Sequence, residues 1–452
     1  MRNKIPVGAK HIIYTLESYG HHAYLVGGCV RDLLMGRQPH DWDICTSATP
    51  DEMKKCFVNW KLIETGLKHG TITVWLENES FEVTTFRVDG HYTDGRRPDD
   101  VQFTKSLIRD LLRRDFTINA IAMSADGTIC DPLDGQLDIK NRVIRCVNNP
   151  RERFDEDGLR IMRAMRFSSV LGFKIEPNTA ASIHDCVGNL EHIASERINT
   201  ELCKMLTGDG VLDVLLDYSD VISFIIPELK PCIGFDQKNK YHQYTVYDHI
   251  AHAVANDDSN DLTVKIALLL HDIGKPCCVT EDENGRHFHG HGVFSRDLAE
   301  QVLTRLRFDT KTKHDVLELV LFHDATMDPT VKVVRRWLNK IGPEQFERLL
   351  HIRIADMLAH TEGTQKTRIE RWSGLKTLFT SVMAEQQCFS LKDLAVNGRD
   401  MMMLGIPEGP EVGAMLHKLM DLVLDGEAPN EKYHLIGLAV HMKAEKELLH
   451  DI

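Results

Sequence analysis

The chain has 452 residues and a mass of 51.4 kDa, which exceeds the size at which a single hydrophobic core stops growing, so several domains are expected. A composition of 42% hydrophobic and 27% charged residues is typical of globular proteins and excludes long disordered segments. The net charge of −13 argues against indiscriminate attraction to nucleic acid. Positive charge is nevertheless concentrated from Arg142 to Arg166, where seven arginines accompany four acidic residues, so a polyanion can bind there.

The N-terminus lacks the apolar core of a secretory signal, and the longest apolar stretches, such as Ile266 to Leu270, are far shorter than a membrane span. We therefore expect a cytoplasmic protein without a membrane partner. The eleven cysteines include no Cys-x-x-Cys pair, which argues against zinc and dithiol motifs and predicts mostly buried thiols.

The first third of the chain predicts a small mixed α/β domain. Residues 11–20 have the apolar spacing of a helix, and a strand ending at Gly27-Gly28 leads into a helix from Val30 to Met35. β-Branched runs before and after residues 77–80 predict a hairpin. The expected strands are 23–26, 41–45, 71–76 and 81–86.

Beyond about residue 150 strand patterns almost vanish and helical periodicity takes over, first from Glu156 through Phe167. The expected fold class is α+β, with a small mixed-sheet head followed by a mostly helical neck, body, embedded domain and tail. The expected domains are 1–148 (head), 149–240 (neck and body, for base and RNA binding), 241–375 (embedded domain) and 376–452 (RNA-binding tail).

Two aspartates follow the glycine turn with the spacing of a metal site. Asp41 and Asp43 are two residues apart on an expected strand, so their side chains point to the same face and can share Mg²⁺, a hard cation that prefers oxygen ligands. Glu82 on a later strand is the natural third carboxylate of the catalytic set. An isolated Asp-x-Asp is more often a solvated turn, and the glycine turn together with Glu82 favours the metal site.

A series of motifs resembles a known family. Leu25-Val-Gly-Gly-Cys-Val-Arg-Asp32, followed by Asp41-Trp-Asp43, resembles the first motif of polymerase-β-type nucleotidyltransferases, in the variant of the class II tRNA nucleotidyltransferases. Further segments resemble that family's ribose-reading, base-reading and neck-stabilising motifs, namely Arg113–Asn119, Glu156–Arg160 and Ser195–Leu202. The resemblance implies template-independent addition of C, C and A to tRNA from CTP and ATP.

The resemblance and the residue chemistry together predict nucleotide contacts. Arg113 and Arg114 offer forked donors for triphosphate oxygens, while Asp115 and Asn119 can hydrogen-bond ribose hydroxyls. Arg31 either contacts phosphate or forms an internal salt bridge. The predicted nucleotide-binding residues are Gly28, Arg31, Arg113, Arg114, Asp115, Asn119, Asp157, Arg160, Arg163 and Arg166.

Asp157 and Arg160 are expected to select the base, because three residues of spacing in a helical run would place them on one face. Cytosine and adenine both present an amino donor beside a ring-nitrogen acceptor, which an Asp acceptor and an Arg donor match. Uracil and guanine have the opposite polarity. The plain alternative is an ordinary helix salt bridge, and Glu156 can brace Arg160.

Residues 87–98 form a polar, glycine-containing segment that resembles the flexible loop of complete CCA-adding family members, which favours the full reaction. Bacterial poly(A) polymerases share much of the head, so a relative that adds A alone or C alone is one alternative. The other is a metal-dependent phosphohydrolase whose head only binds RNA.

Histidines and aspartates in the second half predict another site, because imidazole with carboxylate suits transition metals, or Mg²⁺ with water. The set resembles the HD phosphohydrolase domain, in which a metal-held water can become a nucleophile. A vestigial domain that only packs is the alternative, and His287 and His289 are expected to be solvated loop residues. The matching residues are His249, His271, Asp272 and Asp356, with His291 and His323 as in forms that bind two metals.

Overall fold

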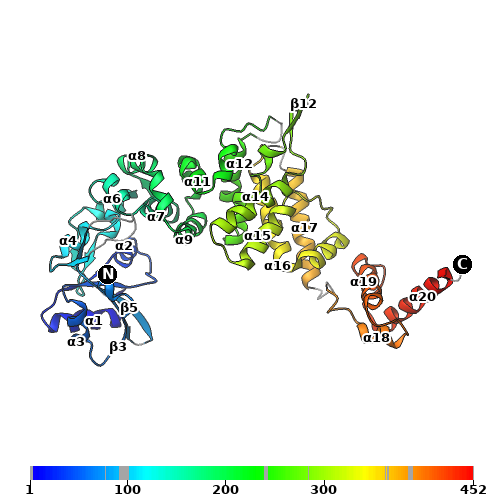
Figure 1. Ribbon diagram of the computed structural model, residues 1–452, viewed down its shortest axis with the longest axis horizontal. Coiled ribbons are helices and arrows are strands. Elements are labelled where there is room, and N and C mark those ends of the chain that lie inside the picture. The colour runs from blue at the N-terminus through cyan, green and yellow to red at the C-terminus, as the bar shows by residue number, and fades with distance from the viewer. Residues whose placement is uncertain are drawn as a thin grey trace. The chain divides into compact units, whose positions relative to one another are not determined.

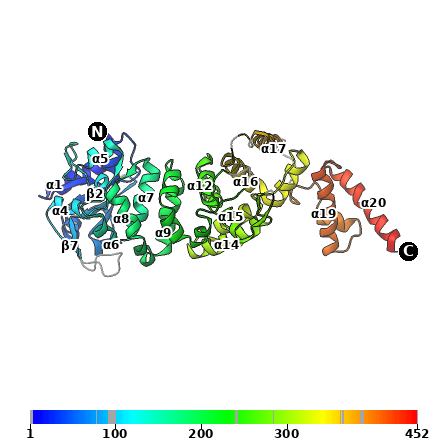
Figure 2. The same ribbon diagram turned by 90° about the horizontal axis from the view of Figure 1, so that it is seen from above.

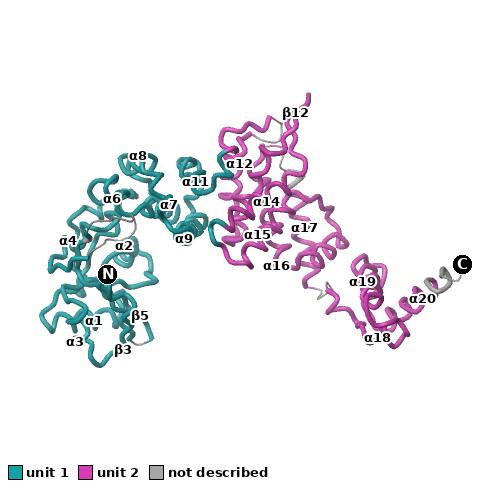
Figure 3. The backbone as a smooth tube through the Cα atoms, viewed as in Figure 1, with its two compact units in different colours: residues 1–230, 305–307 teal, residues 231–304, 308–452 magenta. Residues whose placement is uncertain are grey.

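The computed structural model describes residues 4–76, 78–90, 101–238, 243–283, 285–361, 363, 366–384 and 390–450, so most of the loop expected at 87–98 lies outside the described residues. The chain divides into two compact units, Met1–Lys230 with Arg305–Arg307 and Pro231–Thr304 with Phe308–Ile452 (Figure 3). The finer domain boundaries expected from the sequence stay predictions.

A mixed seven-stranded sheet opens the first unit, in the order β3-β4-β5-β2-β1-β8-β9 (Figure 1). β2 and β5 run parallel and pair Asp43 with Glu82, whereas the other neighbouring strands are antiparallel. The hairpin expected from the β-branched runs is confirmed as β4-β5. The strands are Ala23–Val26 (β1), Asp43–Thr46 (β2), Lys61–Ile63 (β3), Thr71–Leu76 (β4), Glu79–Thr85 (β5), Ala122–Met123 (β8) and Ile129–Cys130 (β9).

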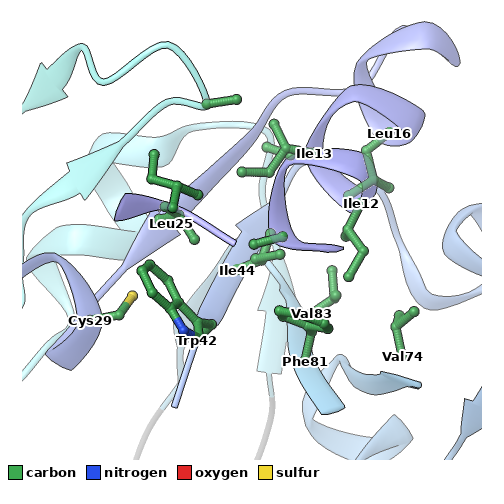
Figure 4. Close-up of a cluster of buried hydrophobic side chains, with 14 of the residues drawn as sticks. Ile12, Ile13, Leu16, Leu25, Cys29, Trp42, Ile44, Val74, Phe81 and Val83 are labelled. Carbon is green, nitrogen blue, oxygen red and sulfur yellow. The ribbon is translucent and has the colours of Figure 1, made fainter. Parts of the chain in front are cut away.

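The two faces of this sheet differ. One face packs against α1 (Val7–Ser18) and α3 (Pro50–Cys56) in a large apolar core, part of which is shown in Figure 4. Ile44 and Val83 point into that core, and since strand side chains alternate, the preceding residues Asp43 and Glu82 point to the opposite face. The core includes Ile12, Ile13, Leu16, Leu25, Ile44, Val74, Phe81 and Val83.

The helix expected across Glu156 to Phe167 is broken, so that expectation is wrong. Asp157 has φ −144° and ψ 103°, which are extended values, and it separates α6 from α7. The next position requires a glycine, because a Cβ on Gly158 would lie 2.6 Å from the carbonyl oxygen of Asn189. The remaining helices of this unit are α2 (Gly28–Leu34), α4 (Leu107–Leu112), α5 (Gly135–Asn141), α6 (Pro150–Glu156), α7 (Leu159–Leu171), α8 (Pro177–Asp185), α9 (Ser195–Leu206), α10 (Val211–Asp217) and α11 (Ser219–Ile225).

Short strands complete the described part of the chain: β6 (Arg87–Asp89) pairs with β7 (Val101–Phe103), β10 (Val143–Ile144) with β11 (Lys174–Ile175), and β12 (Thr280–Asp282) with β13 (Gly285–His287). The last pair lies in the second unit, which is otherwise helical. No helix within the described residues is long and apolar enough to cross a membrane.

In the second unit, α12 and α15 both pack against α16 (Figure 2). The sequence predicts separate helical stretches at 331–338 and 346–359, and the structure joins them in α16, which kinks at Gly342, where φ is 79°, just before Pro343. The last three helices have an apolar core of their own. The helices are α12 (Val246–Asn256), α13 (Leu262–Leu270), α14 (His291–Arg305), α15 (Thr310–Phe322), α16 (Val331–Leu358), α17 (Lys366–Ala384), α18 (Gly398–Met403), α19 (Pro410–Asp425) and α20 (Lys432–His450).

Candidate functional site

Asp43 and Glu82 share a polar cavity on the face of the sheet opposite the large core. The parallel pairing of β2 with β5 makes these two residues direct neighbours. The cavity has a volume of about 190 Å³, and Arg87, Arg113 and Arg114 also line it. Carboxylates that suit a divalent cation therefore lie beside guanidinium groups that suit phosphate.

The electrostatics of Asp43 fit a cation site. Burial raises the pKa of its carboxyl to about 6, with the charges of Glu82 and Asp41 adding to the rise and Arg114 opposing it. A cation between these oxygens would relieve both the burial and the repulsion. Among the described residues, the groups of carboxylates and imidazoles that are close enough to share one ion all lie in the second unit. The carboxylates of Asp41, Asp43 and Glu82 are farther apart than the members of those groups. Asp41 precedes β2, which begins only at Asp43.

The glycine turn after β1 brings the backbone up to this cavity. Gly27 has φ 78°, a conformation that favours glycine. A Cβ on it would lie 3.4 Å from Nη1 of Arg114 and 3.7 Å from Oδ2 of Asp43. The turn therefore keeps the space beside the carboxylate free of side-chain atoms.

Asp110, which the sequence did not single out, holds both arginines of the predicted phosphate pair. Its Oδ1 lies 2.9 Å from Arg113 and its Oδ2 lies 3.2 Å from Arg114. Although burial opposes it, the two guanidinium groups lower the pKa of Asp110. The spacing of three and four residues on a helix was the available signal for these pairs.

Four predicted nucleotide contacts form one chain of hydrogen bonds. Arg31 Nη1 donates to Asn119 Oδ1 at 2.8 Å, and Asn119 Nδ2 donates to Asp115 Oδ1 at 3.2 Å. Arg163 donates to the other Asp115 oxygen through Nε at 2.8 Å and Nη2 at 2.5 Å. Although burial opposes it, Arg163 lowers the pKa of Asp115 to about 2. Arg31 also pairs with Asp32 at 2.8 Å, so the internal salt bridge considered for it is present.

Three arginines in and beside this network lie near one aromatic ring, that of Phe167. The guanidinium groups of Arg31, Arg163 and Arg166 lie 5.2, 5.4 and 4.1 Å from the ring centre of Phe167 on α7. Arg166 also pairs with Glu201 of α9 at 2.7 Å. Gly28 also belongs to the predicted nucleotide-binding residues, and it begins α2 next to Gly27.

Asp157 and Arg160 each have a separate support. Asp157 accepts a hydrogen bond from the Leu159 backbone N–H at 3.0 Å and pairs with Arg197 at 3.2 Å. Arg160 pairs with Glu156 at 2.5 Å, and its Nη2 reaches the carbonyl oxygen of Arg113 at 3.4 Å. Asp157 has extended backbone angles, but its carbonyl oxygen accepts a hydrogen bond from the Arg160 N–H at 3.0 Å, so the turn that begins α7 sets the separation of the two residues. Arg197 is a support that the sequence did not indicate.

Six predicted residues of the second unit meet in one buried cluster. Asp272 Oδ1 lies 3.3 Å from His291 and 3.6 Å from His323, while its Oδ2 lies 3.4 Å from His249 and 3.2 Å from His271. Asp356 Oδ1 lies 2.9 Å from His249 and 3.6 Å from His271. Every side chain in the set is nearly inaccessible to solvent.

Backbone carbonyls orient the four imidazoles. Nδ1 of His271, His291 and His323 lies 2.6, 2.8 and 2.7 Å from a carbonyl oxygen three residues earlier, and Nδ1 of His249 lies 3.3 Å from the Ala359 oxygen. A carbonyl only accepts, so a ring that is neutral here would carry its proton on Nδ1 and turn the Nε2 lone pair inward. The four Nε2 atoms face the two carboxylates, and although burial opposes it, Asp272 and Asp356 raise the pKa of His271 to about 10.

Several atoms of this cluster lack ordinary partners. His271 Nε2 and both Asp272 oxygens are buried without a well-formed hydrogen bond to any described residue. Nε2 of His291 and Nε2 of His323 are only 2.9 Å apart. Lys275 supplies one positive charge, 2.6 Å from Asp272 Oδ2. The donor set and its orphaned atoms fit a metal centre. His287, which pairs with Asp282 and stacks on His289, is not among these groups.

Three families match parts of the chain. Residues 23–145 match the Poly A polymerase head domain, residues 172–233 match the Probable RNA and SrmB-binding site of polymerase A, and residues 293–439 match tRNA nucleotidyltransferase domain 2. The head match contains the Asp43–Glu82 cavity and its arginines.

Whole-chain relatives agree with these matches. A CCA-adding enzyme of Levilactobacillus brevis is 35% identical over 95% of this chain and 96% of its own, and one of Lacticaseibacillus paracasei is 32% identical over 96% of each. The crystal structure of Bacillus stearothermophilus CCA-adding enzyme in complex with CTP has a TM-score of 0.74 and 30% identity, over 97% of this chain and 98% of that one. The chain belongs to the family of CCA-adding enzymes, which are tRNA nucleotidyltransferases.

Proposed function

We propose that this chain adds C, C and A to the 3′ end of tRNA from CTP and ATP, without a nucleic-acid template and with release of pyrophosphate. The observation that carries the proposal is the cavity in which Asp43 and Glu82 lie beside arginines held by Asp110. The names of the whole-chain relatives and the CTP in the similar solved structure support the same reaction. We place the reaction in the cytoplasm.

In this proposal Asp41, Asp43 and Glu82 hold Mg²⁺ in the head. Mg²⁺ bound there supplies positive charge for an in-line displacement at the α-phosphate. Arg113 and Arg114, fixed by Asp110, bind triphosphate oxygens with forked donors. In the displacement the tRNA 3′-hydroxyl gives up its proton to solvent and its oxygen bonds to the α-phosphorus, while the bond from that phosphorus to the bridging oxygen breaks and pyrophosphate leaves.

Base choice belongs to Asp157 and Arg160 in this proposal. The Asp157 carboxylate accepts from the exocyclic amino group of cytosine or adenine, and the Arg160 guanidinium donates to the adjacent ring nitrogen. Uracil and guanine would set donor against donor and acceptor against acceptor, and unpaired buried groups are costly. Arg31, Asp115, Asn119, Arg163 and Arg166 surround the sugar and phosphates.

Product sequencing tests this function. The full-length protein is incubated with Mg²⁺, tRNA lacking its 3′ CCA and all four NTPs, and CCA termini are the expected product. Asp43→Asn should slow extension at least a hundredfold, because it removes about 3 kcal/mol or more of charge stabilisation. Tails of A alone or of C alone would instead assign a partial or poly(A)-type activity, and absence of extension would leave an RNA-binding head.

The buried cluster favours a second activity, a metal-dependent phosphohydrolase that removes phosphate from RNA ends. His249, His271, Asp272 and Asp356, with His291 and His323, are the proposed ligands, and imidazole nitrogen favours a transition metal over Mg²⁺. A metal bound there would supply an activated water as nucleophile. The supporting observation is the set of Nε2 atoms that face the carboxylates, together with the buried Asp272 Oδ1, which has no well-formed hydrogen bond to any described residue.

Two assays in Ni²⁺ or Mn²⁺ test this activity: opening of 2′,3′-cyclic phosphate ends to monoesters, and phosphate release from 2′-phosphate ends. The double variant His271→Ala, Asp272→Ala should lose the release and retain CCA addition in Mg²⁺. No hydrolysis by the intact protein with any divalent metal would favour a purely structural role for the cluster. Loss of both activities in a folded double variant would mean that the sites depend on each other.

A further inference from the structure

His360, which the sequence pattern did not include, joins the buried cluster at the end of α16. It follows the residue that caps this helix, and only 8% of it is exposed. Its Nε2 lies 3.5 Å from Asp356 Oδ1, and its ring centre lies 5.3 Å from that of His249. One potential ligand atom from each of these three residues lies within 4.8 Å of the other two.

Two of the distances among these three residues are close to those between ligands of one ion. Nitrogen and oxygen ligands lie about 2.0–2.1 Å from a transition metal, so ligands at tetrahedral or adjacent octahedral positions are about 2.8–3.4 Å apart. The separations are 2.9 Å between His249 Nε2 and Asp356 Oδ1, and 3.5 Å between that oxygen and His360 Nε2. A cation at their centre would need little movement of the side chains.

The end of α16 also fixes the proton of His249. The Ala359 carbonyl oxygen lies 3.3 Å from Nδ1 of His249, and because a carbonyl only accepts, it favours a proton on that nitrogen in the neutral ring. In that tautomer the Nε2 lone pair faces Asp356 Oδ1 at 2.9 Å. A lone pair facing a carboxylate at this distance calls for a cation between them.

We propose that His360 is a metal ligand, and that it holds an ion together with His249 and Asp356. This inference rests on the proposed metal cluster and adds a residue to it. A second group of the same composition, Asp272 with His291 and His323, shares no residue with the first. Each group offers two imidazoles and one carboxylate, a set that suits Fe, Mn, Co, Ni or Zn and leaves coordination positions for water.

The test is metal binding by the full-length protein after removal of metals with a chelator. The protein is titrated with Co²⁺ or Ni²⁺ in excess Mg²⁺, which occupies the carboxylates of the head. We expect two ions in the wild type. His360→Ala and His360→Asn should each weaken one of them at least about tenfold and change the Co²⁺ absorption spectrum. His314→Gln is the matched control, because that side chain on α15 is 72% exposed.

Asparagine separates a ligand from a positioning residue. Its amide can still donate to Asp356, but it lacks the imidazole nitrogen that binds a transition metal. Weak binding in the alanine variant with normal binding in the asparagine variant would overturn the proposal, as would unchanged affinity in both. If the wild type takes up no transition metal, the metal cluster itself is refuted. CCA addition by the variants checks that the first unit is intact.

Discussion

At the scale of single residues, the proposed nucleotide site depends on side chains that hold its predicted contact residues in place. Asp110 is the clearest case, because one fully buried carboxylate pairs with both Arg113 and Arg114. Without it the two guanidinium groups would repel each other beside the cavity. Asp110 would thus orient Arg113 and Arg114 for a triphosphate that it does not itself bind.

Asp110→Asn should raise the KM for both CTP and ATP, since the arginines lose the anion that holds them. Removal of one partner from a buried ion pair also costs about 3–5 kcal/mol of stability. Steady-state kinetics and urea unfolding measure the two effects. The exposed Asp185→Asn on α8 is the control, and unchanged KM values in folded Asp110→Asn would contradict the role of Asp110.

The low pKa of Asp115 predicts that the free energy of unfolding depends on pH in the acid range. Its pKa is lowered from 3.8 to about 2 in the folded state, so its contribution is present above the unfolded pKa and is lost as the pH falls toward 2. The shift corresponds to about 2 kcal/mol at neutral pH. The stability gap between wild type and Asp115→Asn should therefore shrink between about pH 5 and pH 2, as followed by denaturant unfolding. A gap that stays constant with pH would rule out this linkage.

At the scale of elements, local patterns predicted what short segments determine and missed what distant segments impose. The hairpin β4-β5 and the two halves of α16 were predictable from β-branched runs and apolar periodicity. The break at Asp157 was not, because the constraint on Gly158 comes from the Asn189 carbonyl more than thirty residues away. Likewise the motif residues of the proposed site were predictable, whereas Arg197 reaches Asp157 only through a tertiary contact. Asp110 and His360 lie three or four residues from their partners, a local signal that no motif singled out.

Gly158→Ala should disturb the base-reading pair, because the added Cβ would lie 2.6 Å from a backbone oxygen and push α6 or α7 away. Overpacking of this kind costs about 1–3 kcal/mol. We expect weaker selection against UTP and GTP in an NTP competition assay, together with lower stability. Gly188→Ala is the control, since a Cβ there meets no described atom within 4 Å. Unaltered selection among the NTPs would show that base choice does not depend on the break between α6 and α7.

At the scale of the whole molecule, the two units offer different ligand chemistry, oxygen-rich in the first and imidazole-rich in the second. Thermal unfolding should accordingly resolve into two transitions. CTP with Mg²⁺ should stabilise the first unit and Ni²⁺ the second, each by about 2.7 kcal/mol at a hundredfold excess over its Kd. Calorimetry of the full chain measures both shifts. A single transition that both ligands move equally would show that the units unfold together.

The polar cavity also has a consequence for the order in which substrates and ions accumulate on the protein. Asp43 and Glu82 bring two carboxylates to its lining, and Arg87, Arg113 and Arg114 bring three guanidinium groups. The two carboxylates repel a nucleotide triphosphate, and a divalent cation bound to them would remove that repulsion. By thermodynamic reciprocity the nucleotide must raise the affinity for the cation by the same factor. The concentration of free Mg²⁺ would then limit the fraction of the protein that has nucleotide bound, even when CTP and ATP are abundant.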